Sequence, residues 1–349
     1  MTVCAVTNKM NSPPVFEDLR SVAKLLVVAL LYFLTVTPAL ASEQIENRGA
    51  DTQNWWDKLP HAEWAAFERL EAVGNWFEVY RIRPHVYALY EPGQFEEVIS
   101  FLIVGSERAL LFDTGLGIGD IQAEVQHLTS LDVTVLNSHT HYDHVGGNFQ
   151  FDQRWARDTA FGRQRMSGLS HDQMSEAVQE GWIWKPTPSG FDAASYTSRA
   201  WEFEGYVQEG MQIDLGGLSL EVIFTPGHAP DCISLLDRHN RMLFTGDTFY
   251  LAPLYSHLEG SNFHDYVASA AKLRTYQPLV DTLVTSHNVP TADASYLGSL
   301  DTAMQSILAG EAEYVDTDGA REYDFGPFSV ITHSPPNSPP QSPPVQGSH

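Results

Sequence analysis

A loop in the first half of the chain carries four candidate metal ligands within six residues. In the segment LNSHTHYDHVGGN, at 136–148, these are His139, His141, Asp143 and His144. Imidazole and carboxylate groups are costly to bury unless a partner satisfies them, and a metal cation would satisfy all four. His139 and His141 are two residues apart, so both side chains can point to the same side of an extended segment. The spacing therefore predicts a metal site in this loop.

Three further candidate ligands follow apolar strands in the second half of the chain. They are His228 in FTPGHAPD, Asp247 in LFTGDTFY and His287 in LVTSHN. A lone histidine is more often a satisfied surface or core residue, and Asp after Gly is more often a turn. A full set of five His and two Asp, each at the end of an apolar strand, favours a metal. Ligands of nitrogen and oxygen without a thiolate suit Zn²⁺, and Fe or Mn can also occupy such a site.

The hydrophobic pattern predicts the elements that would position these residues. In the first half, strands are expected at 76–82, 85–90, 96–105, 109–115 and 132–138. In the second half, they are expected at 208–214, 218–225, 232–237 and 241–245. Helices, single or divided, are expected at 51–70, 118–128, 262–276 and 292–308.

The ordered motifs resemble the metal signature of the metallo-β-lactamase superfamily. They are His139-x-His141-x-Asp143-His144, Gly227-His228, Gly246-Asp247 and Ser286-His287. The resemblance extends from about Trp76 to about Ile331. It implies an α/β fold, a four-layer αββα sandwich of two similar halves with the metals at one edge of the two sheets.

The same resemblance implies a role for each matching residue. His139, His141 and His228 would hold the first metal. Asp143, His144 and His287 would hold the second, and Asp247 would bridge both. Asp113, at the end of ALLFDTG, would brace the histidine loop, since carboxylates behind a metal site fix the orientation of its ligands; the alternative is a turn aspartate before Gly115. Gly146 and Gly147 would let the backbone pass close beneath the site.

The implied chemistry is hydrolysis by a hydroxide shared between two zinc ions, with the catalytic Asp143 orienting it and relaying its proton. We expect an exported enzyme that cleaves an ester, lactone, thioester or amide bond of a small molecule. Asp247 weakens a β-lactamase assignment, because thiolate-type zinc β-lactamases have Cys there and the other di-zinc enzymes lack the bridging acid. Flavodiiron proteins usually have Glu in place of His141. Glyoxalase II and the quorum-quenching lactonases share all seven ligands, although glyoxalase II has a basic C-terminal region that this chain lacks.

Three alternatives to this hydrolase remain. The first is a β-lactamase-type amide hydrolase. The second is an oxidoreductase resembling the single-iron persulfide dioxygenases, which metal analysis would distinguish by one iron instead of two zinc ions. The third is a binding module without catalysis, which the complete ligand set disfavours. The oligomeric state is not indicated by the sequence.

Aromatic residues in an insert at about 161–206 are candidates for packing or for a lid over the site. A superfamily fold would place this insert and the segment after Asp247 beside the metal cleft. The candidate substrate-binding residues are Trp182, Trp184, Tyr250, Tyr255 and His257.

Charge and length restrict the function further. The 349 residues include 20 Lys and Arg against 44 Asp and Glu, a net charge of −24. A nucleic-acid partner would therefore be repelled over most of the surface, and none is expected. A chain of this length can bury one large core without disulfides. Cys4 lies in a segment expected to be removed, and Cys232, within an apolar run, is expected in the core.

The N-terminal segment has the pattern of a signal peptide. Arg20 and Lys24 precede an apolar run at 25–34, and small residues at 39–41 follow. Cleavage after Ala41 would release a periplasmic or secreted protein without a stable membrane span, and an uncleaved anchor is the alternative. We expect this organisation: a signal peptide at 1–41, translated from Met1 or Met10; an N-terminal helical extension at 42–75; the metal-binding domain at 76–332; and a disordered Pro- and Ser-rich tail at 333–349.

Overall fold

The computed structural model describes residues 55–317 and 319–333. The chain divides into two compact units, 1–57 and 58–349, and the second contains all the strands of the described residues. The expected signal peptide and nearly all of the expected C-terminal tail lie outside the described residues. Among the described residues, no helix is both long and apolar enough to cross a membrane.

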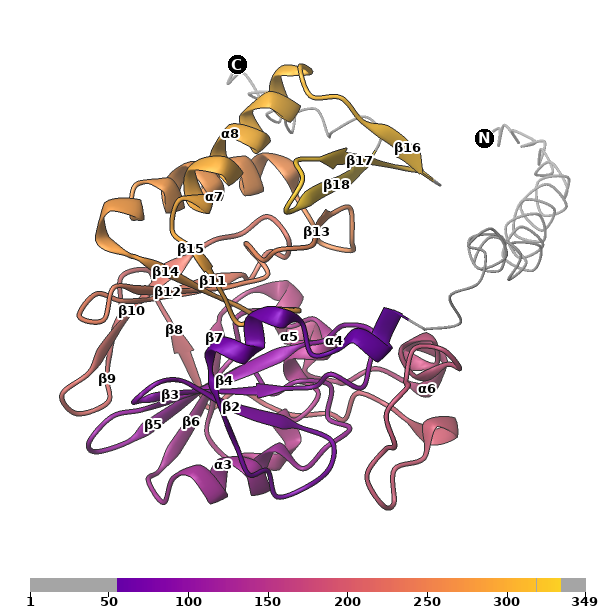
Figure 1. The fold of residues 1–349 in the computed structure, drawn as a ribbon, viewed down its shortest axis with the longest axis vertical. Helices are drawn as coiled ribbons and strands as arrows, with labels where there is room; N and C mark the ends of the chain where they lie inside the picture. Colours follow the sequence, from indigo (N-terminus) through magenta and orange to yellow (C-terminus); the bar gives the residue numbers. More distant parts are fainter. Residues whose placement is uncertain (1–54, 318, 334–349) are drawn as a thin grey trace, which may run out of the picture. The chain divides into compact units, whose positions relative to one another are not determined.

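The first sheet contains eight strands within the described residues, arranged in chain order (Figure 1). They are β1 (Glu68–Leu70), β2 (Glu78–Arg83), β3 (Val86–Tyr90), β4 (Ile99–Val104), β5 (Ala109–Phe112), β6 (Val133–Leu136), β7 (Arg154–Arg157) and β8 (Gly205–Val207). Neighbours are antiparallel from β1 to β5 and parallel from β5 to β8. Because β5 and β6 are parallel, their C-terminal ends lie at the same edge of the sheet.

The second sheet has the order β15-β14-β12-β11-β10-β9. Its strands are β9 (Gln212–Asp214), β10 (Ser219–Phe224), β11 (Ile233–Asp237), β12 (Met242–Gly246), β14 (Thr282–Thr285) and β15 (Thr291–Asp293). Both β10 and β12 are antiparallel to β11, and β14 is parallel to β12, so β10, β12 and β14 run in one direction. Their C-terminal ends therefore meet at one edge. A smaller sheet has the order β13-β18-β17-β16 and contains β13 (Pro253–Ser256), β16 (Val315–Thr317), β17 (Ala320–Asp324) and β18 (Ser329–His333).

Helices flank the two large sheets. The α-helices are α3 (Ile121–Leu128), α4 (Tyr142–Val145), α5 (Ala160–Arg165), α6 (His171–Met174), α7 (Phe263–Arg274) and α8 (Tyr296–Ala309). The 3-10 helices are η1 (Trp55–Lys58), η2 (Ala62–Ala66), η3 (Asn148–Gln150), η4 (Glu176–Val178), η5 (Ala193–Ser195) and η6 (Gln277–Leu279). Figure 1 shows α7 and α8 over the second sheet and α3 beside the first.

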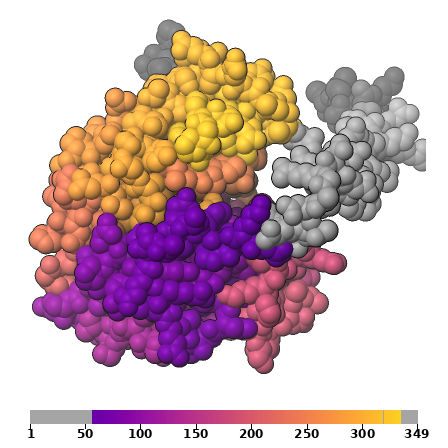
Figure 2. Space-filling model, in the orientation of Figure 1, coloured from indigo at the N-terminus to yellow at the C-terminus, as the bar shows by residue number. Residues whose placement is uncertain are grey.

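Three clusters of apolar side chains fill the spaces between these layers. The cluster between the sheets contains Phe101 and Phe112 of the first sheet and Phe244 of the second, with both pairs of rings meeting edge to face. A second cluster joins α7 and α8 to the outer face of the second sheet. A third joins α3 and part of the insert to the outer face of the first. This order of layers is the expected αββα sandwich. In the space-filling view, first-half residues (indigo and magenta) and second-half residues (orange and yellow) form adjoining parts of the surface (Figure 2).

Some expected elements have other boundaries in the structure, and one sheet was not expected. The described part of the helical region expected over 51–70, from Trp55 on, forms two short 3-10 helices, which agrees with the divided alternative because Pro60 interrupts any continuous helix, but its end, Glu68–Leu70, is strand β1, paired with β2. The helix expected from Ala292 begins later, since Thr291–Asp293 pairs with β14 as β15. The smaller sheet was not anticipated at all. Cys232 is buried with a free thiol, as expected.

Candidate metal centre

Segments that follow five strands carry the seven candidate ligands and Asp113, with Asp143 and His144 in the short helix α4. Asp113 follows β5, and the segment 139–144 follows β6. His228, Asp247 and His287 follow β10, β12 and β14, whose C-terminal ends share one edge of the second sheet. The ends of the strands of both sheets meet, so that ligands as far apart in the chain as His139 and His287, 148 positions, belong to one cluster. Tertiary structure thus forms one cluster from two halves.

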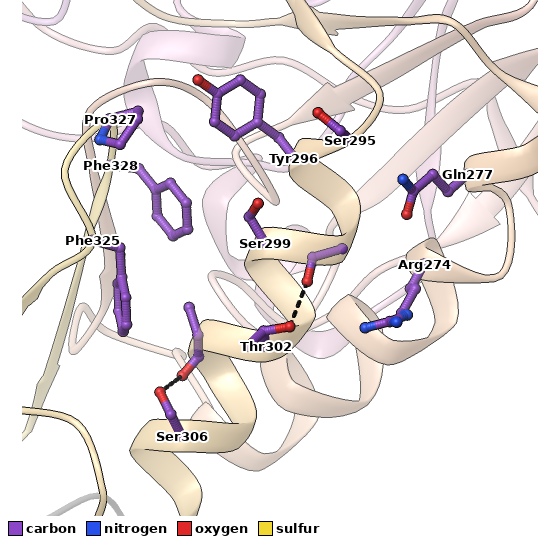
Figure 3. A pocket seen from close by; sticks show the side chains of 12 residues that line it. Arg274, Gln277, Ser295, Tyr296, Ser299, Thr302, Ser306, Phe325, Pro327 and Phe328 are labelled. Atoms are coloured by element: carbon purple, nitrogen blue, oxygen red, sulfur yellow. Dashed lines mark hydrogen bonds between the residues drawn. The ribbon is translucent and has the colours of Figure 1, made fainter.

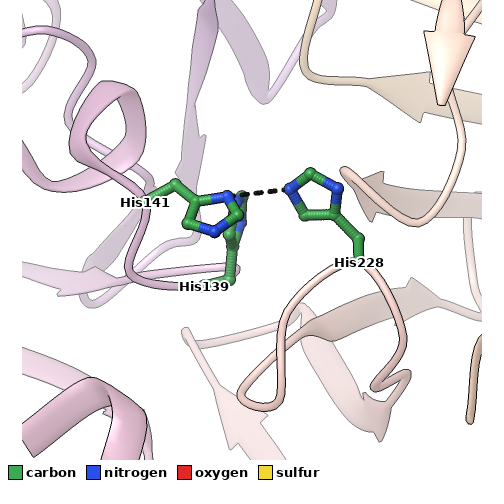
Figure 4. A group of neighbouring side chains, drawn as sticks. All are labelled: His139, His141 and His228. Carbon is green, nitrogen blue, oxygen red and sulfur yellow. Dashed lines mark hydrogen bonds between the residues drawn. The ribbon is translucent and has the colours of Figure 1, made fainter. Parts of the chain in front are cut away.

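The first group of ligands consists of His139, His141 and His228, which converge in Figure 4. The Nδ1 atom of His141 lies 3.0 Å from Nε2 of His139 and 2.8 Å from Nε2 of His228. Ligands about 2.0–2.1 Å from a tetrahedral zinc lie about 3.3 Å from one another, so a small adjustment of the rings would accommodate the ion. The donor types and their convergence fit zinc.

The second group consists of Asp143, His144 and His287. Nε2 of His144 lies 3.2 Å from Oδ2 of Asp143 and 3.3 Å from Nε2 of His287. Asp247 lies between the two groups. Its Oδ1 is 3.2 Å from His144 Nε2 and 3.1 Å from His287 Nε2, and its Oδ2 is 3.5 Å from His228 Nε2. One carboxylate thus presents an oxygen to each group, the arrangement required of a bridging ligand.

Hydrogen bonds on the far side of three rings fix which nitrogen faces the cluster. His228 Nδ1 lies 2.8 Å from the carbonyl oxygen of Tyr255, and His287 Nδ1 lies 2.7 Å from that of Glu96. His144 Nδ1 lies 2.9 Å from Oδ2 of Asp113. Because each acceptor favours a proton on Nδ1, Nε2 is the nitrogen of the neutral ring that can offer its lone pair to a metal.

Asp113 is fully buried and connects two parts of the histidine loop. Besides His144, it accepts a hydrogen bond from the backbone N–H of Ser138 at 2.6 Å. Its own φ of 67° is unusual for a residue with a side chain. The loop also depends on Gly146, where a Cβ would lie 2.2 Å from the backbone carbon of Leu116. A side chain there would displace the ligands.

Burial and mutual charge shift the pKa values of these groups in opposite directions. Burial, reinforced by neighbouring imidazoles, lowers the pKa of His141 to about 3 and that of His139 well below its usual value. Burial opposes charge on His287 as well, but Asp247 and Asp143 outweigh it and raise its pKa to about 9. The pKa of His144 is shifted upward by the same carboxylates. Two buried carboxylates among five imidazoles would be balanced by bound cations, which supports the fit of a metal.

A cavity of about 410 Å³ opens onto this cluster. Most of the proposed ligands line it, together with Trp182, Tyr250 and Tyr255 from the predicted substrate residues. Trp184 does not line it, and its indole N–H instead donates to the carbonyl of Pro92 at 2.7 Å. His257 lines a separate cavity with His333.

The insert contributes both packing and lining residues. Tyr196 and Phe191 pack against the outer cluster of the first sheet, and the Tyr196 hydroxyl donates to the carbonyl of Leu116 at 2.6 Å. Trp182 instead lies beside Phe95 at the cavity, with ring centroids 4.6 Å apart. Within the insert, Tyr196 and Phe191 therefore serve packing, Trp182 lines the cavity, and a lid stays a prediction.

Sequence reasoning missed several cavity residues. Those not anticipated are Phe95, Glu96, Tyr142, Arg165, Gln173, Met174, Glu176, Ala177, Leu258 and Glu259. Most lie on loops or short helices that no periodic pattern marks. Tyr142 carried the clearest signal, because it sits between two candidate ligands. A further pair was missed inside the protein: the Thr140 hydroxyl donates to Asp231 at 2.6 Å, linking the loops that carry His139 and His228.

A larger cavity, of about 620 Å³, lies away from the candidate ligands (Figure 3). Polar side chains along one face of α8 form one wall, among them Ser299 and Thr302. Phe325 and Phe328, from the turn between β17 and β18, form another. The described residues that line it include none of the candidate metal ligands, so its size does not make it the reaction site.

Comparison with known proteins identifies relatives of the chain. Residues 95–287 match the metallo-beta-lactamase superfamily. The acyl-coenzyme A thioesterase MBLAC2 of Bos taurus is 28% identical over 203 residues, covering 53% of this chain and 69% of the relative. The hydroxyacylglutathione hydrolase GloC of Haemophilus influenzae is 24% identical over 159 residues, covering 45% of this chain and 68% of the relative.

Solved structures also resemble the chain. A metallo-beta-lactamase family protein from Thermus thermophilus aligns with a TM-score of 0.49 and 20% identity, covering 66% of this chain and 82% of that protein. A metallo-beta-lactamase from Pontibacter korlensis aligns with a TM-score of 0.47 and 17% identity, covering 66% of this chain and 99% of that protein.

Proposed function

This chain belongs to the metallo-beta-lactamase superfamily of metal-dependent hydrolases, and from that premise we propose that it cleaves a thioester or ester bond of a small molecule with two zinc ions. The observation that carries the proposal is the position of Asp247, with one carboxylate oxygen toward each group of histidines. The names of the relatives support thioesters as substrates, since two of them are a thioesterase and a hydroxyacylglutathione hydrolase.

The residues of the first group would hold one zinc ion, those of the second group the other, and Asp247 both. Bound zinc would bring the pKa of a coordinated water near 7 and stabilise negative charge on the carbonyl oxygen of the substrate. In hydrolysis the bond from the acyl carbon to sulfur or oxygen breaks, the carbon takes the oxygen of water, and the leaving thiol or alcohol takes a proton. The chain must therefore position a water molecule, accept its proton and deliver a proton to the leaving group.

Asp143 is suited to the first two tasks. It lines the cavity and is 5% exposed, so its carboxylate can reach a bound water while remaining shielded from bulk solvent. Burial alone would raise the pKa of Asp143, but the neighbouring His144 favours the charged carboxylate and helps to hold the pKa of Asp143 below its usual value. A charged carboxylate can accept a hydrogen bond from the water and orient its lone pair toward the acyl carbon.

Tyr250 and Tyr255 are suited to donate hydrogen bonds. Burial raises the pKa of Tyr255 to about 12 and shifts that of Tyr250 upward as well, so both phenols remain protonated near neutral pH. The Tyr250 ring lies 4.8 Å from the ring of His287, beside the second ligand group. A phenol at this position can donate to the oxyanion or to the leaving group.

Metal content and substrate hydrolysis together test the proposal. We expect the purified protein to contain two zinc ions per chain and to hydrolyse members of a panel of thioesters, esters and lactones. One iron per chain with consumption of oxygen would instead establish the oxidoreductase alternative. Two zinc ions without hydrolysis of any panel member would refute the proposed reaction.

We also propose export, supported by Arg20, Lys24, the apolar run at 25–34 and the small residues before Ser42. The protein would then act in the periplasm or outside the cell.

A further inference from the structure

The cavity over the metal centre has an apolar wall. Phe95, Met174, Ala177, Trp182 and Leu258 contribute to it. Phe95 is 43% exposed and Leu258 is 37% exposed, so part of this apolar surface is open to a ligand that enters the cavity. Covering this surface with an apolar group would release water from it and so favour binding.

Hydrogen bonds hold the wall in place before any ligand binds. The backbone N–H of Phe95 donates to the carbonyl of Trp182 at 2.9 Å. The side-chain amide of Gln94 donates to the carbonyl of Ala177 at 3.0 Å. These bonds join the insert to the loop before β4, so the apolar surface is preformed and an acyl group would not have to organise it.

The polar part of the same cavity is acidic. The carboxylates of Glu96, Glu176 and Glu259 line it in addition to the two aspartate ligands. Glu96 accepts a hydrogen bond from the Tyr142 hydroxyl and Glu259 pairs with Arg165, so Glu176 contributes the unpaired glutamate charge of the described lining. Arg165 is the sole Lys or Arg among the described lining residues, and its guanidinium lies 2.6 Å from Oε2 of Glu259. It also lies over the ring of Phe161, at 4.8 Å from the ring centre. Arg165 is therefore already neutralised and poorly placed to bind a phosphate.

Resting on the proposed function, we infer that the site selects a substrate with an apolar acyl chain and a leaving group that does not carry several negative charges. The apolar wall would hold the acyl chain. Glu176 would repel a leaving group with phosphates, because Arg165 is paired with Glu259 and no other basic side chain of the described lining would compensate the charge of Glu176. Substrate choice would thus depend on chain length at one side of the scissile bond and on charge at the other.

Matched thioesters separate these two features. We would measure kcat/KM of the zinc-loaded protein for acetyl, butyryl and octanoyl thioesters of N-acetylcysteamine, which is uncharged, and of coenzyme A, which carries phosphates. We expect kcat/KM to increase at least about tenfold from acetyl to octanoyl, since each buried methylene favours binding. At low salt, we expect kcat/KM to be about tenfold higher for N-acetylcysteamine thioesters than for coenzyme A thioesters. The difference in kcat/KM should be smaller at high salt, because ions screen the repulsion.

Variants test the assigned residues. Trp182→Ala should reduce the ratio of octanoyl to acetyl kcat/KM several-fold. Glu176→Lys should reduce the difference in kcat/KM between N-acetylcysteamine and coenzyme A thioesters. Trp184→Ala is the matched control for the tryptophan, because Trp184 lies in the same segment without lining the cavity. Zinc content and thermal unfolding would be measured for all variants to separate substrate selection from folding.

The outcomes distinguish this inference from the proposed function. Hydrolysis that favours coenzyme A thioesters, or that is independent of acyl length, would overturn the inference and leave the hydrolase intact. The inference would also be overturned if the ratio of octanoyl to acetyl kcat/KM were the same in the Trp182→Ala and Trp184→Ala variants. Two bound zinc ions without hydrolysis of any thioester or ester would overturn the proposed function, and the inference with it.

Discussion

Replacing Asp113 by Asn should selectively weaken the second metal. Asn keeps an oxygen that can accept the N–H of Ser138, but it presents an amide N–H₂ toward Nδ1 of His144, where the carboxylate now accepts. Two donors would then face each other in a fully buried site. The imidazole can relieve this conflict by moving its proton to Nε2, which removes the lone pair that faces Asp143 and Asp247.

The expected loss of zinc affinity follows from the free-energy cost of an unsatisfied buried donor, about 1–3 kcal/mol. Because 1.4 kcal/mol corresponds to a factor of ten, affinity for the second zinc ion should fall by about 10- to 100-fold. The first zinc ion should be retained, since the hydrogen bonds of His139, His141 and His228 within the described structure go to partners other than Asp113. Activity should decline in parallel with occupancy of the second site.

Competition with a chromogenic chelator measures both affinities. The control is Asp120→Asn, which removes the same charge from an exposed helix cap where Asn serves equally well. If Asp113→Asn binds two zinc ions as tightly as the unchanged protein, Asp113 does not orient His144. If both sites weaken equally, Asp113 acts on the whole loop through Ser138, and the selective explanation fails.

Four further outcomes are expected. Metal analysis of the Asp247→Ala variant should find one zinc ion and little of the second, because a shared anion no longer offsets the repulsion between the two cations. Unchanged metal content and activity would contradict the bridging role. In protein from the native host, mass spectrometry should find Ser42 at the mature N-terminus, and an intact cytosolic precursor would exclude export. The hydrogen bond to Glu97 raises the pKa of His61 above 6.5; its stabilising contribution is therefore full below pH 6.5 and lost as the pH rises through the raised value. Thermal unfolding should show His61→Gln to be more destabilising at about pH 6 than at about pH 9, and equal losses would argue against the ion pair. Phe244→Ala should lower the free energy of unfolding, measured in urea, by about 3–5 kcal/mol, because this fully buried ring fills the space between the two sheets. A loss under about 1 kcal/mol would show that the core closes around the gap.

Much of the fold was predictable because strands and helices have local signatures. The apolar runs that became β3, β4, β5, β10 and β11 were recognised within a few residues, and so were α3 and α7. Errors arose where pairing with distant strands decided the structure. Glu68–Leu70 carries no strand pattern of its own, yet the exposed edge of β2 provides hydrogen-bond partners for it. The same holds for Thr291–Asp293 beside β14.

The sequence by itself determined the chemical identity of the candidate ligands and their place at strand ends, because ligand type and spacing are local properties. Only the tertiary structure decided which other side chains join them. Trp182 and Trp184 are nearly indistinguishable in sequence, but the bridge between Gln94 and Ile183 leaves Trp182 beside Phe95 at the cavity while Trp184 bonds to Pro92. Likewise, the acidic character of the cavity depends on segments far apart in the chain. Such proximity follows from how the loops pack across the two halves, and no single stretch of residues encodes it.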